Sequence, residues 1–296
     1  MDINNNNSAD ELHLLRVIKS LNVTKIRSPM TFEQTKAWLN QFEKGPEKTL
    51  ALLILRFLIY RTSDQLKSSL KQAFKDAATS FIPHDITFCV DWRSVLEGKV
   101  ADLEFSYGPV KQDDTRPGKS GEVISRLLKH CIPLDGSQLI YPNASTILNK
   151  NQRYLLVDDG IYTGTQLSTF LQAEGSFMVG NGQSAIVVGF AHEDAIKNLG
   201  NRFPSVPIFY GEKITKKECF KALSEDWVKN GLWQYPNISP LDQYHLIVER
   251  NFDSRVSNPL GFGDLGCMIA YDHGIPDNSL QLLWDKSDSW NPLFER

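Results

Sequence analysis

The middle of the chain alternates between short, continuously apolar runs and segments whose apolar residues recur at helical spacing. The apolar runs predict strands over residues 86–92, 138–141, 153–158, 185–190 and 206–210. The helical spacing predicts helices over residues 122–130 and 194–199, and another that begins near Thr165. Continuous apolar runs are typical of strands buried on both faces, and their alternation with helices is typical of a parallel sheet. We therefore expect an α/β fold over residues 81–215, with a doubly wound, mainly parallel sheet.

The N-terminal residues 1–80 follow a helical pattern. An apolar stripe covers residues 10–21, and further helices begin at Thr31 and Pro46. The helix that begins at Pro46 is expected to run through Leu58 and to break near residues 62–64, before a capped helix over residues 65–78. We interpret this N-terminal helical region as a cap on the core, with a surface for a binding partner as the alternative.

The C-terminal residues 216–296 combine both patterns. They predict helices over residues 217–229 and 240–253 and a strand over residues 267–271. We interpret them as a mixed C-terminal extension that packs on the core. The sequence therefore divides into three parts, with boundaries near residues 80 and 215.

Composition adds little to this picture but excludes several classes of protein. The 296 residues are 41% hydrophobic and 23% charged, as in an ordinary globular protein, and the net charge of −3 provides no general attraction to nucleic acid. We find no secretory leader and no membrane span, since the apolar run over residues 50–60 is short and contains Arg56. We expect a cytoplasmic protein whose cysteines are reduced core thiols, because the four of them are widely spaced: Cys89, Cys131, Cys219 and Cys267.

The strongest chemical signal lies over residues 153–166. A predicted buried strand ends in Asp158 and Asp159, and a Thr-Gly-Thr turn at residues 163–165 opens the next helix. The free N–H groups and the dipole of a helix N-terminus favour an anion, while carboxylates accept hydrogen bonds from sugar hydroxyls. A ligand with a phosphate at one end and a diol at the other would satisfy both sites, and ribose 5-phosphate is such a ligand. The alternative is a solvated strand end with Thr163 as a simple helix cap.

This motif resembles the ribose-phosphate motif of the type I phosphoribosyltransferase family. The resemblance implies that Asp158 and Asp159 bind the ribose 2- and 3-hydroxyls, and that both act indirectly on a Mg²⁺ ion that accompanies the diphosphate of phosphoribosyl pyrophosphate. It also implies that the 5-phosphate is wrapped by Tyr162, Thr163, Gly164, Thr165 and Gln166.

Two positions depart from the family pattern. Tyr162 stands where purine-salvage members carry an acid, and tyrosine is a poor base near neutral pH. Gln166 replaces the hydroxyl that usually ends the phosphate loop, although its amide can still donate to a phosphate oxygen.

Further contacts to a diphosphate are predicted in two other segments. The polar loop over residues 108–121 suits a lid over an anionic ligand, with Arg116, Lys119 and Ser120 as its contacts, and a plain solvated loop is the alternative. Arg93 follows the first predicted core strand, where the family holds the diphosphate in a turn of small residues. The neighbouring Trp92 is too bulky for a close approach of the backbone.

A second resemblance extends over more of the chain. The helical start, residues 119–121 (Lys-Ser-Gly) and the tail from His273 to Asn278 resemble the phosphoribosyltransferase-like effectors of bacterial defence loci, including retrons. The resemblance implies a toxin that acts on a phosphorylated ribose or nucleotide and is restrained by a reverse transcriptase with its RNA–DNA product. His273 is a candidate base or a structural turn residue. The alternative function is a nucleotide-sensing module without turnover, which explains Tyr162 and Gln166 better.

Overall fold

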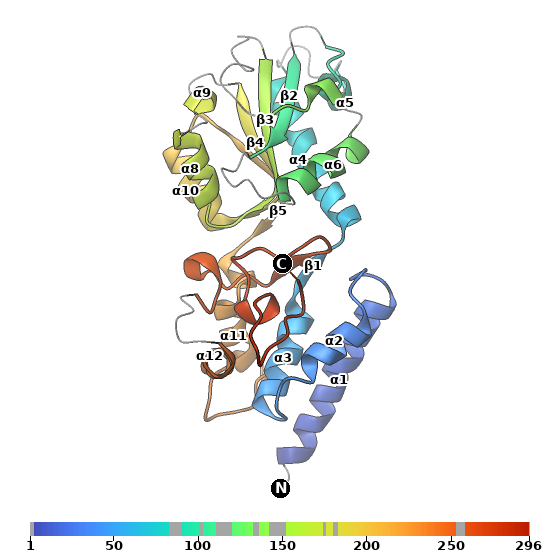
Figure 1. Ribbon diagram of the computed structural model, residues 1–296, viewed down its shortest axis with the longest axis vertical. Helices are drawn as coiled ribbons and strands as arrows, with labels where there is room; N and C mark the ends of the chain where they lie inside the picture. Colours follow the sequence, from blue (N-terminus) through green and yellow to red (C-terminus); the bar gives the residue numbers. More distant parts are fainter. Residues whose placement is uncertain are drawn as a thin grey trace. The chain divides into compact units, whose positions relative to one another are not determined.

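The computed structural model describes residues 3–82, 90–100, 103–110, 120–132, 136–141, 152–173, 176–179, 183–252 and 258–295 (Figure 1). The chain folds into two compact units. Unit 1 contains residues 1–63 and 216–296, and unit 2 contains residues 64–215. The predicted boundary at residue 215 coincides with a unit boundary, whereas the first boundary lies at residue 63 instead of residue 80. Residues 1–63 of the predicted N-terminal region and the whole predicted C-terminal region therefore belong to one unit, whereas residues 64–80 belong to unit 2.

Unit 2 is built on a four-stranded sheet in the order β2-β3-β4-β5, and every neighbouring pair is parallel. Its strands are β2 (Glu104–Pro109), β3 (Gln152–Ile161), β4 (Ser184–His192) and β5 (Ile208–Ile214). Every residue of β4 is buried, as expected for a central strand.

Helices cover both faces of this sheet. The helices of unit 2 are α4 (Ser63–Phe81), α5 (Trp92–Leu96), α6 (Ser120–Cys131), α8 (Thr165–Ala173), α9 (Ser176–Val179) and α10 (Glu193–Arg202). Apolar residues of α8 and α10 share a core with alternate strand residues such as Leu156 and Val188. On the opposite face, Phe74 of α4 contacts the ring of Tyr107 at 6.5 Å between centroids. The predicted doubly wound α/β class is therefore confirmed.

Several predicted elements of unit 2 have different bounds. β3 does not stop at Asp158 but continues to Ile161, and Gly160 and Ile161 still pair with β4. The strand predicted over residues 138–141 is wrong: a 3₁₀ turn (Gly136–Gln138) is followed by a single bridge from Leu139 to Tyr107. Of the strand predicted over residues 86–92, residues 86–89 lie outside the described residues, and Trp92 begins α5.

Unit 1 combines segments from both ends of the chain. Its helices are α1 (Ile3–Val23), α2 (Phe32–Leu39), α3 (Pro46–Phe57), α11 (Phe220–Lys229) and α12 (Pro240–Asn251), with short 3₁₀ turns at Lys216–Glu218, Phe262–Asp264 and Gln281–Leu283. α3 is the most buried of them, and its apolar residues share one core with Trp227, Tyr244 and Trp290. The indole N–H groups of Trp38 and Trp290 both donate to the Leu282 carbonyl, at 3.2 and 3.0 Å.

A short parallel pair of strands joins the two segments of unit 1. β1 (Ile59–Arg61) follows α3 directly and pairs with β6 (Ile269–Tyr271), in the register Tyr60 to Ala270. The hydroxyl and backbone N–H of Ser63 then donate to the two carboxylate oxygens of Asp272, at 2.8 and 2.6 Å. The end of α3 is capped by Arg27, which donates to the carbonyls of Leu55 and Leu58 at 2.6 and 3.0 Å.

Among the residues that the structure describes, no helix is both long and apolar enough to cross a bilayer.

Candidate functional site

The two acidic residues of the motif lie near the carboxyl end of β3. Asp158 is buried, with 7% of its surface exposed, and Asp159 is half-buried. The backbone N–H of Asp159 donates to the Asp158 carboxylate at 2.9 Å, and that of Gly160 donates to the Asp159 carboxylate at 2.7 Å. A carboxylate oxygen pair accepts about four hydrogen bonds, so each of these groups can accept several donors at once.

The turn after β3 connects these carboxylates to α8. Thr163 is half-buried, and its hydroxyl accepts a hydrogen bond from the backbone N–H of Thr165 at 3.3 Å, as a residue that caps a helix does. Thr165 and Gln166 are exposed in the first turn of the helix. Tyr162 is different, because only 6% of it is exposed, so its side chain forms part of the protein interior.

Gly164 is the residue that this turn depends on. Its φ of +76° lies in the left-handed region, which is unfavourable for residues with a Cβ. A Cβ at this position would lie 3.1 Å from Cγ of Leu199 and 3.5 Å from Cα of Ala195, both in α10. The glycine therefore allows the turn to lie against α10.

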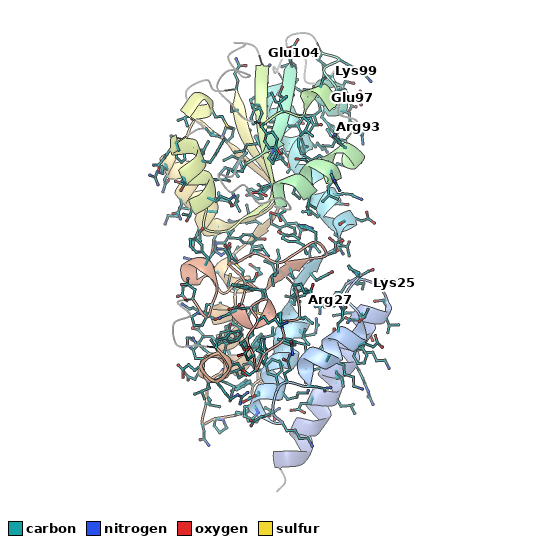
Figure 2. All side chains as sticks on the ribbon, viewed as in Figure 1. Lys25, Arg27, Arg93, Glu97, Lys99 and Glu104 are labelled. Carbon is teal, nitrogen blue, oxygen red and sulfur yellow. The ribbon has the colours of Figure 1, made fainter. Side chains whose placement is uncertain are left out.

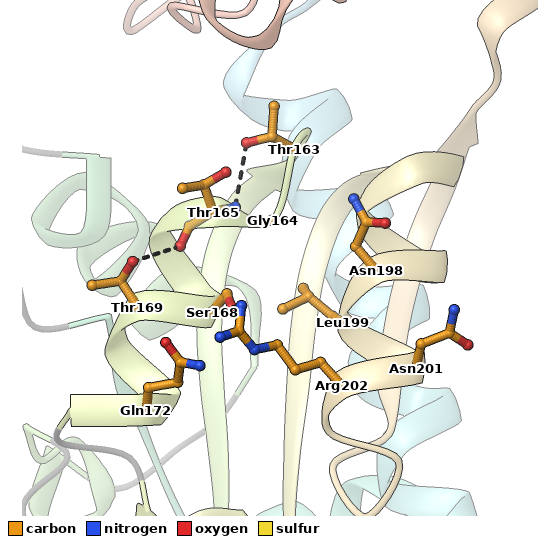
Figure 3. Close-up of a pocket in the computed structure, with 10 residues that line it drawn as sticks. All are labelled: Thr163, Gly164, Thr165, Ser168, Thr169, Gln172, Asn198, Leu199, Asn201 and Arg202. Carbon is orange, nitrogen blue, oxygen red and sulfur yellow. Dashed lines mark hydrogen bonds between the residues drawn. The ribbon is translucent and has the colours of Figure 1, made fainter.

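The turn opens onto a pocket between α8 and α10. Its volume is about 470 Å³, and Figure 3 shows ten residues around it. Most of the side chains that line it are neutral hydrogen-bonding groups, hydroxyls from α8 and carboxamides from both helices. The full set is Thr163, Gly164, Thr165, Ser168, Thr169, Gln172, Asn198, Leu199, Asn201 and Arg202. Three of the predicted phosphate-binding residues, at positions 163–165, are in this set, whereas the two carboxylates of β3 are not.

Arg202 is a site residue that the sequence analysis missed. It is the last residue of α10, and its guanidinium donates to the Ser168 hydroxyl at 3.0 Å, one turn into α8 (Figure 3). It is the only charged residue among those described around the pocket. No spacing in the sequence indicates this contact, because it joins two helices that are 34 residues apart at this point.

Of the predicted diphosphate contacts, Arg93 is not brought to this turn. Arg93 is exposed in α5, with its guanidinium 4.7 Å from the ring centroid of Trp92. Figure 2 shows it on the same side as Glu97, Lys99 and Glu104, the first residue of β2. The turn at residues 163–165 follows the opposite, carboxyl end of a parallel strand. Arg116 and Lys119 lie outside the described residues, and Ser120 begins α6 with a side chain that is likewise outside them.

His273 lies in unit 1, so it belongs to a different unit from the motif. Its ring stacks on Tyr271 at 5.1 Å between centroids, and its Nδ1 atom lies 3.4 Å from the Asp272 carboxylate. Both contacts are within one turn, which agrees with a structural role for this histidine.

A direct metal site is also not apparent. Over the described ranges, no group of three or more histidine, cysteine or acidic residues is arranged to hold a metal ion. Two adjacent carboxylates are too few to bind Mg²⁺ alone, because this ion prefers six oxygen ligands and usually takes several of them from water and substrate phosphates. The residues present fit a magnesium ion only when a diphosphate ligand carries it.

Comparison with protein families agrees with this geometry. The family model named PRTase-CE matches residues 35–296, which is most of the chain. The chain belongs to the PRTase-CE family. This PRTase-CE member is therefore a phosphoribosyltransferase-like protein, as the motif over residues 153–166 predicted. No curated protein matches its sequence.

Proposed function

We propose that this PRTase-CE member binds a ligand that contains ribose 5-phosphate, either phosphoribosyl pyrophosphate or a nucleotide, and breaks or forms the bond at its anomeric carbon. The observation that carries the proposal is the turn at residues 163–165, which leads from the carboxylates of β3 into the N-terminus of α8. The same short segment offers hydrogen-bond acceptors for hydroxyls and hydrogen-bond donors for phosphate.

The 5-phosphate is assigned to the first turn of α8. The N–H groups at the start of a helix have no partner within the helix, and the helix dipole is positive there. The hydroxyls of Thr163 and Thr165 lie beside these groups, and Arg202 adds a positive charge one turn further along. A charge-assisted hydrogen bond of this kind stabilises a bound phosphate more than a neutral hydrogen bond does.

The ribose hydroxyls are assigned to Asp158 and Asp159. Cleavage at the anomeric carbon develops positive charge on the sugar ring, and two nearby carboxylates stabilise that charge. Since Tyr162 is buried and is a poor base near neutral pH, we assign it no proton transfer. Magnesium, when it arrives with the diphosphate, would supply charge neutralisation for the leaving group.

The biological role rests on the sequence resemblance to defence effectors alone. In this proposal, a cytoplasmic toxin consumes or modifies a nucleotide, and a reverse transcriptase with its RNA–DNA product restrains it.

Nucleotide sensing without turnover is the second candidate. It is favoured by the buried Tyr162, because the acid that assists proton transfer in purine-salvage enzymes is replaced by a residue that faces the interior.

The test compares pyrophosphate release from phosphoribosyl pyrophosphate, in the presence of Mg²⁺ and a nucleotide extract, with ligand binding measured by calorimetry. The decisive variant is Asp158→Asn with Asp159→Asn, which removes two charges with little change of shape. The matched control is Glu225→Gln with Asp226→Asn, an exposed pair of neighbouring acids on α11.

Release that is lost in the first variant and kept in the second supports the transferase. Binding without release by any form of the protein supports the sensor and excludes the transferase. If phosphoribosyl pyrophosphate and nucleotides all fail to bind the folded protein, both proposals are wrong.

A further inference from the structure

Two of the four cysteines face each other across a single antiparallel bridge in unit 1. Cys219 directly precedes α11, Cys267 lies two residues before β6, and the bridge pairs one directly with the other. The backbone N–H of Phe220 donates to the Gly266 carbonyl at 2.8 Å. This bond places the cysteines at a position of the ladder where the two facing residues do not bond to each other through their backbones.

Such a position is the closest that two facing residues reach in an antiparallel pair. Their Cα atoms are typically about 4.5 Å apart. Disulfide bonds join Cα atoms that are about 4.4–6.8 Å apart, so the bridge geometry lies within the range for a disulfide without movement of the backbone.

The surroundings hold both cysteines in place. Cys219 is 4% exposed and Cys267 is 1% exposed. On its other side, the backbone of Cys267 accepts a hydrogen bond from Leu280 at 3.2 Å and donates one to Asn278 at 3.0 Å. A hydrogen bond between the two thiols, followed by burial, raises the pKa of Cys267 well above its usual value. Cys267 is therefore protonated at rest at neutral pH, and the thiolate that reacts with an oxidant is a minor species.

We propose that Cys219 and Cys267 are a redox modification site that forms a reversible disulfide on exposure to a peroxide. One thiol, as its thiolate, attacks the peroxide and becomes a sulfenic acid with loss of water from hydrogen peroxide. The second thiol attacks that sulfur, and a second water leaves. Two thiols and one hydrogen peroxide thus give one disulfide and two waters.

The location of this bond gives it a structural effect. The chain leaves unit 1 after Ser63 and re-enters it at Lys216, three residues before Cys219. The segment before Ser63, where the chain leaves unit 1, is already bound to the residues around β6. β1 pairs with β6, and Ser63 donates two hydrogen bonds to Asp272. A disulfide from Cys267 to Cys219 would attach the point of re-entry covalently to the same segment.

The experiment uses the full chain, hydrogen peroxide as the oxidant and alkylation of free thiols in denaturant as the readout. The reduced protein should take up four alkyl groups, one for each cysteine. After peroxide treatment it should take up two, and a thiol reductant should restore all four. Digestion with trypsin should yield the peptides of residues 218–221 and 256–286 joined by a disulfide.

Variants separate this pair from the other two cysteines. A protein with Cys89→Ser and Cys131→Ser should still form the joined peptides and should lose about two mass units on oxidation, the two hydrogen atoms of the thiols. The single variants Cys219→Ser and Cys267→Ser should form no joined peptide from the remaining member. Four alkylated thiols after complete peroxide treatment would overturn the proposal, and so would oxidation to sulfinic acid without a cross-link.

Discussion

Replacement of Gly164 by alanine tests how strongly the phosphate turn depends on one backbone conformation. A residue with a Cβ pays about 1–2 kcal/mol in the left-handed region. The new methyl group would lie 3.1 and 3.2 Å from two carbon atoms of Leu199, a close contact to which we assign about 1 kcal/mol. Alanine also lowers the conformational entropy of the unfolded chain, which stabilises the folded state by about 0.4–1 kcal/mol. The expected net destabilisation of unit 2 is about 2 kcal/mol.

Hydrogen exchange measured by mass spectrometry reports this change where it occurs. Amides in the central strands β3 and β4 exchange only when the unit unfolds, so they should exchange about 30-fold faster in Gly164→Ala, since about 1.4 kcal/mol corresponds to a factor of ten. The same variant should bind ribose 5-phosphate more weakly, because the turn must move away from α10.

A glycine elsewhere in the same unit provides the control. Gly200 lies in α10, and a Cβ there would meet no atom within 4 Å. Gly200→Ala should slow the exchange slightly or leave it unchanged, because alanine favours the helix by up to about 1 kcal/mol. If Gly164→Ala exchanged and bound ligand like Gly200→Ala, the turn would not need its left-handed residue and the reasoning would be wrong.

Two further predictions concern charged residues. Arg202→Gln should weaken binding of ribose 5-phosphate, measured by calorimetry at low salt, about tenfold, which is the lower end of what a charged hydrogen bond contributes. Lys197→Gln on the same helix is the control and should have little effect on binding. Equal losses in the two variants would indicate general charge attraction and contradict the assignment of Arg202. Glu47→Gln should destabilise unit 1 by about 1 kcal/mol at pH 7, because Glu47 forms a two-pronged pair with Arg250 at 2.7 and 2.8 Å and the exposure of Arg250 limits the gain. Burial raises the pKa of Glu47, but hydrogen bonds from Arg250 and a backbone N–H outweigh it and hold the pKa below its usual 4.5. The advantage over the glutamine variant should therefore be complete above about pH 5 and should be lost as the pH falls through the lowered pKa of Glu47, as measured by urea titrations. An advantage that does not decrease on acidification would contradict this.

The local pattern of the sequence was enough to predict the motif and most of the central elements. The start of α8 at Thr165 is confirmed, since a capping hydroxyl and apolar residues at helical spacing are both local signals. The extension of β3 to Ile161 was not predictable in this way. Asp158, Asp159 and Gly160 interrupt the apolar run, and they remain in the strand because β4 supplies a parallel partner as far as Ala191.

Long-range pairing accounts for the other differences. β1 closely follows the apolar helix α3, and its first two residues, Ile59 and Tyr60, extend that apolar run. They form a strand only because β6 lies beside them, about 200 residues later in the sequence. Arg202 was missed for the same reason, because its role depends on the approach of two helices and not on its neighbours in the chain.

The discontinuity of unit 1 has a consequence for synthesis of the protein. Its first segment, residues 1–63, leaves the ribosome before unit 2, but its partner strand β6 and the helices that share its core come only after residue 216. Unit 2 has all of its strands within residues 64–215 and can fold while the chain is still growing. During that time the face of α3 that packs on α12 and the other C-terminal core residues is uncovered. A chain that is interrupted before residue 216 would therefore carry a folded sheet attached to an exposed hydrophobic helix, which is the kind of product that chaperones and proteases recognise.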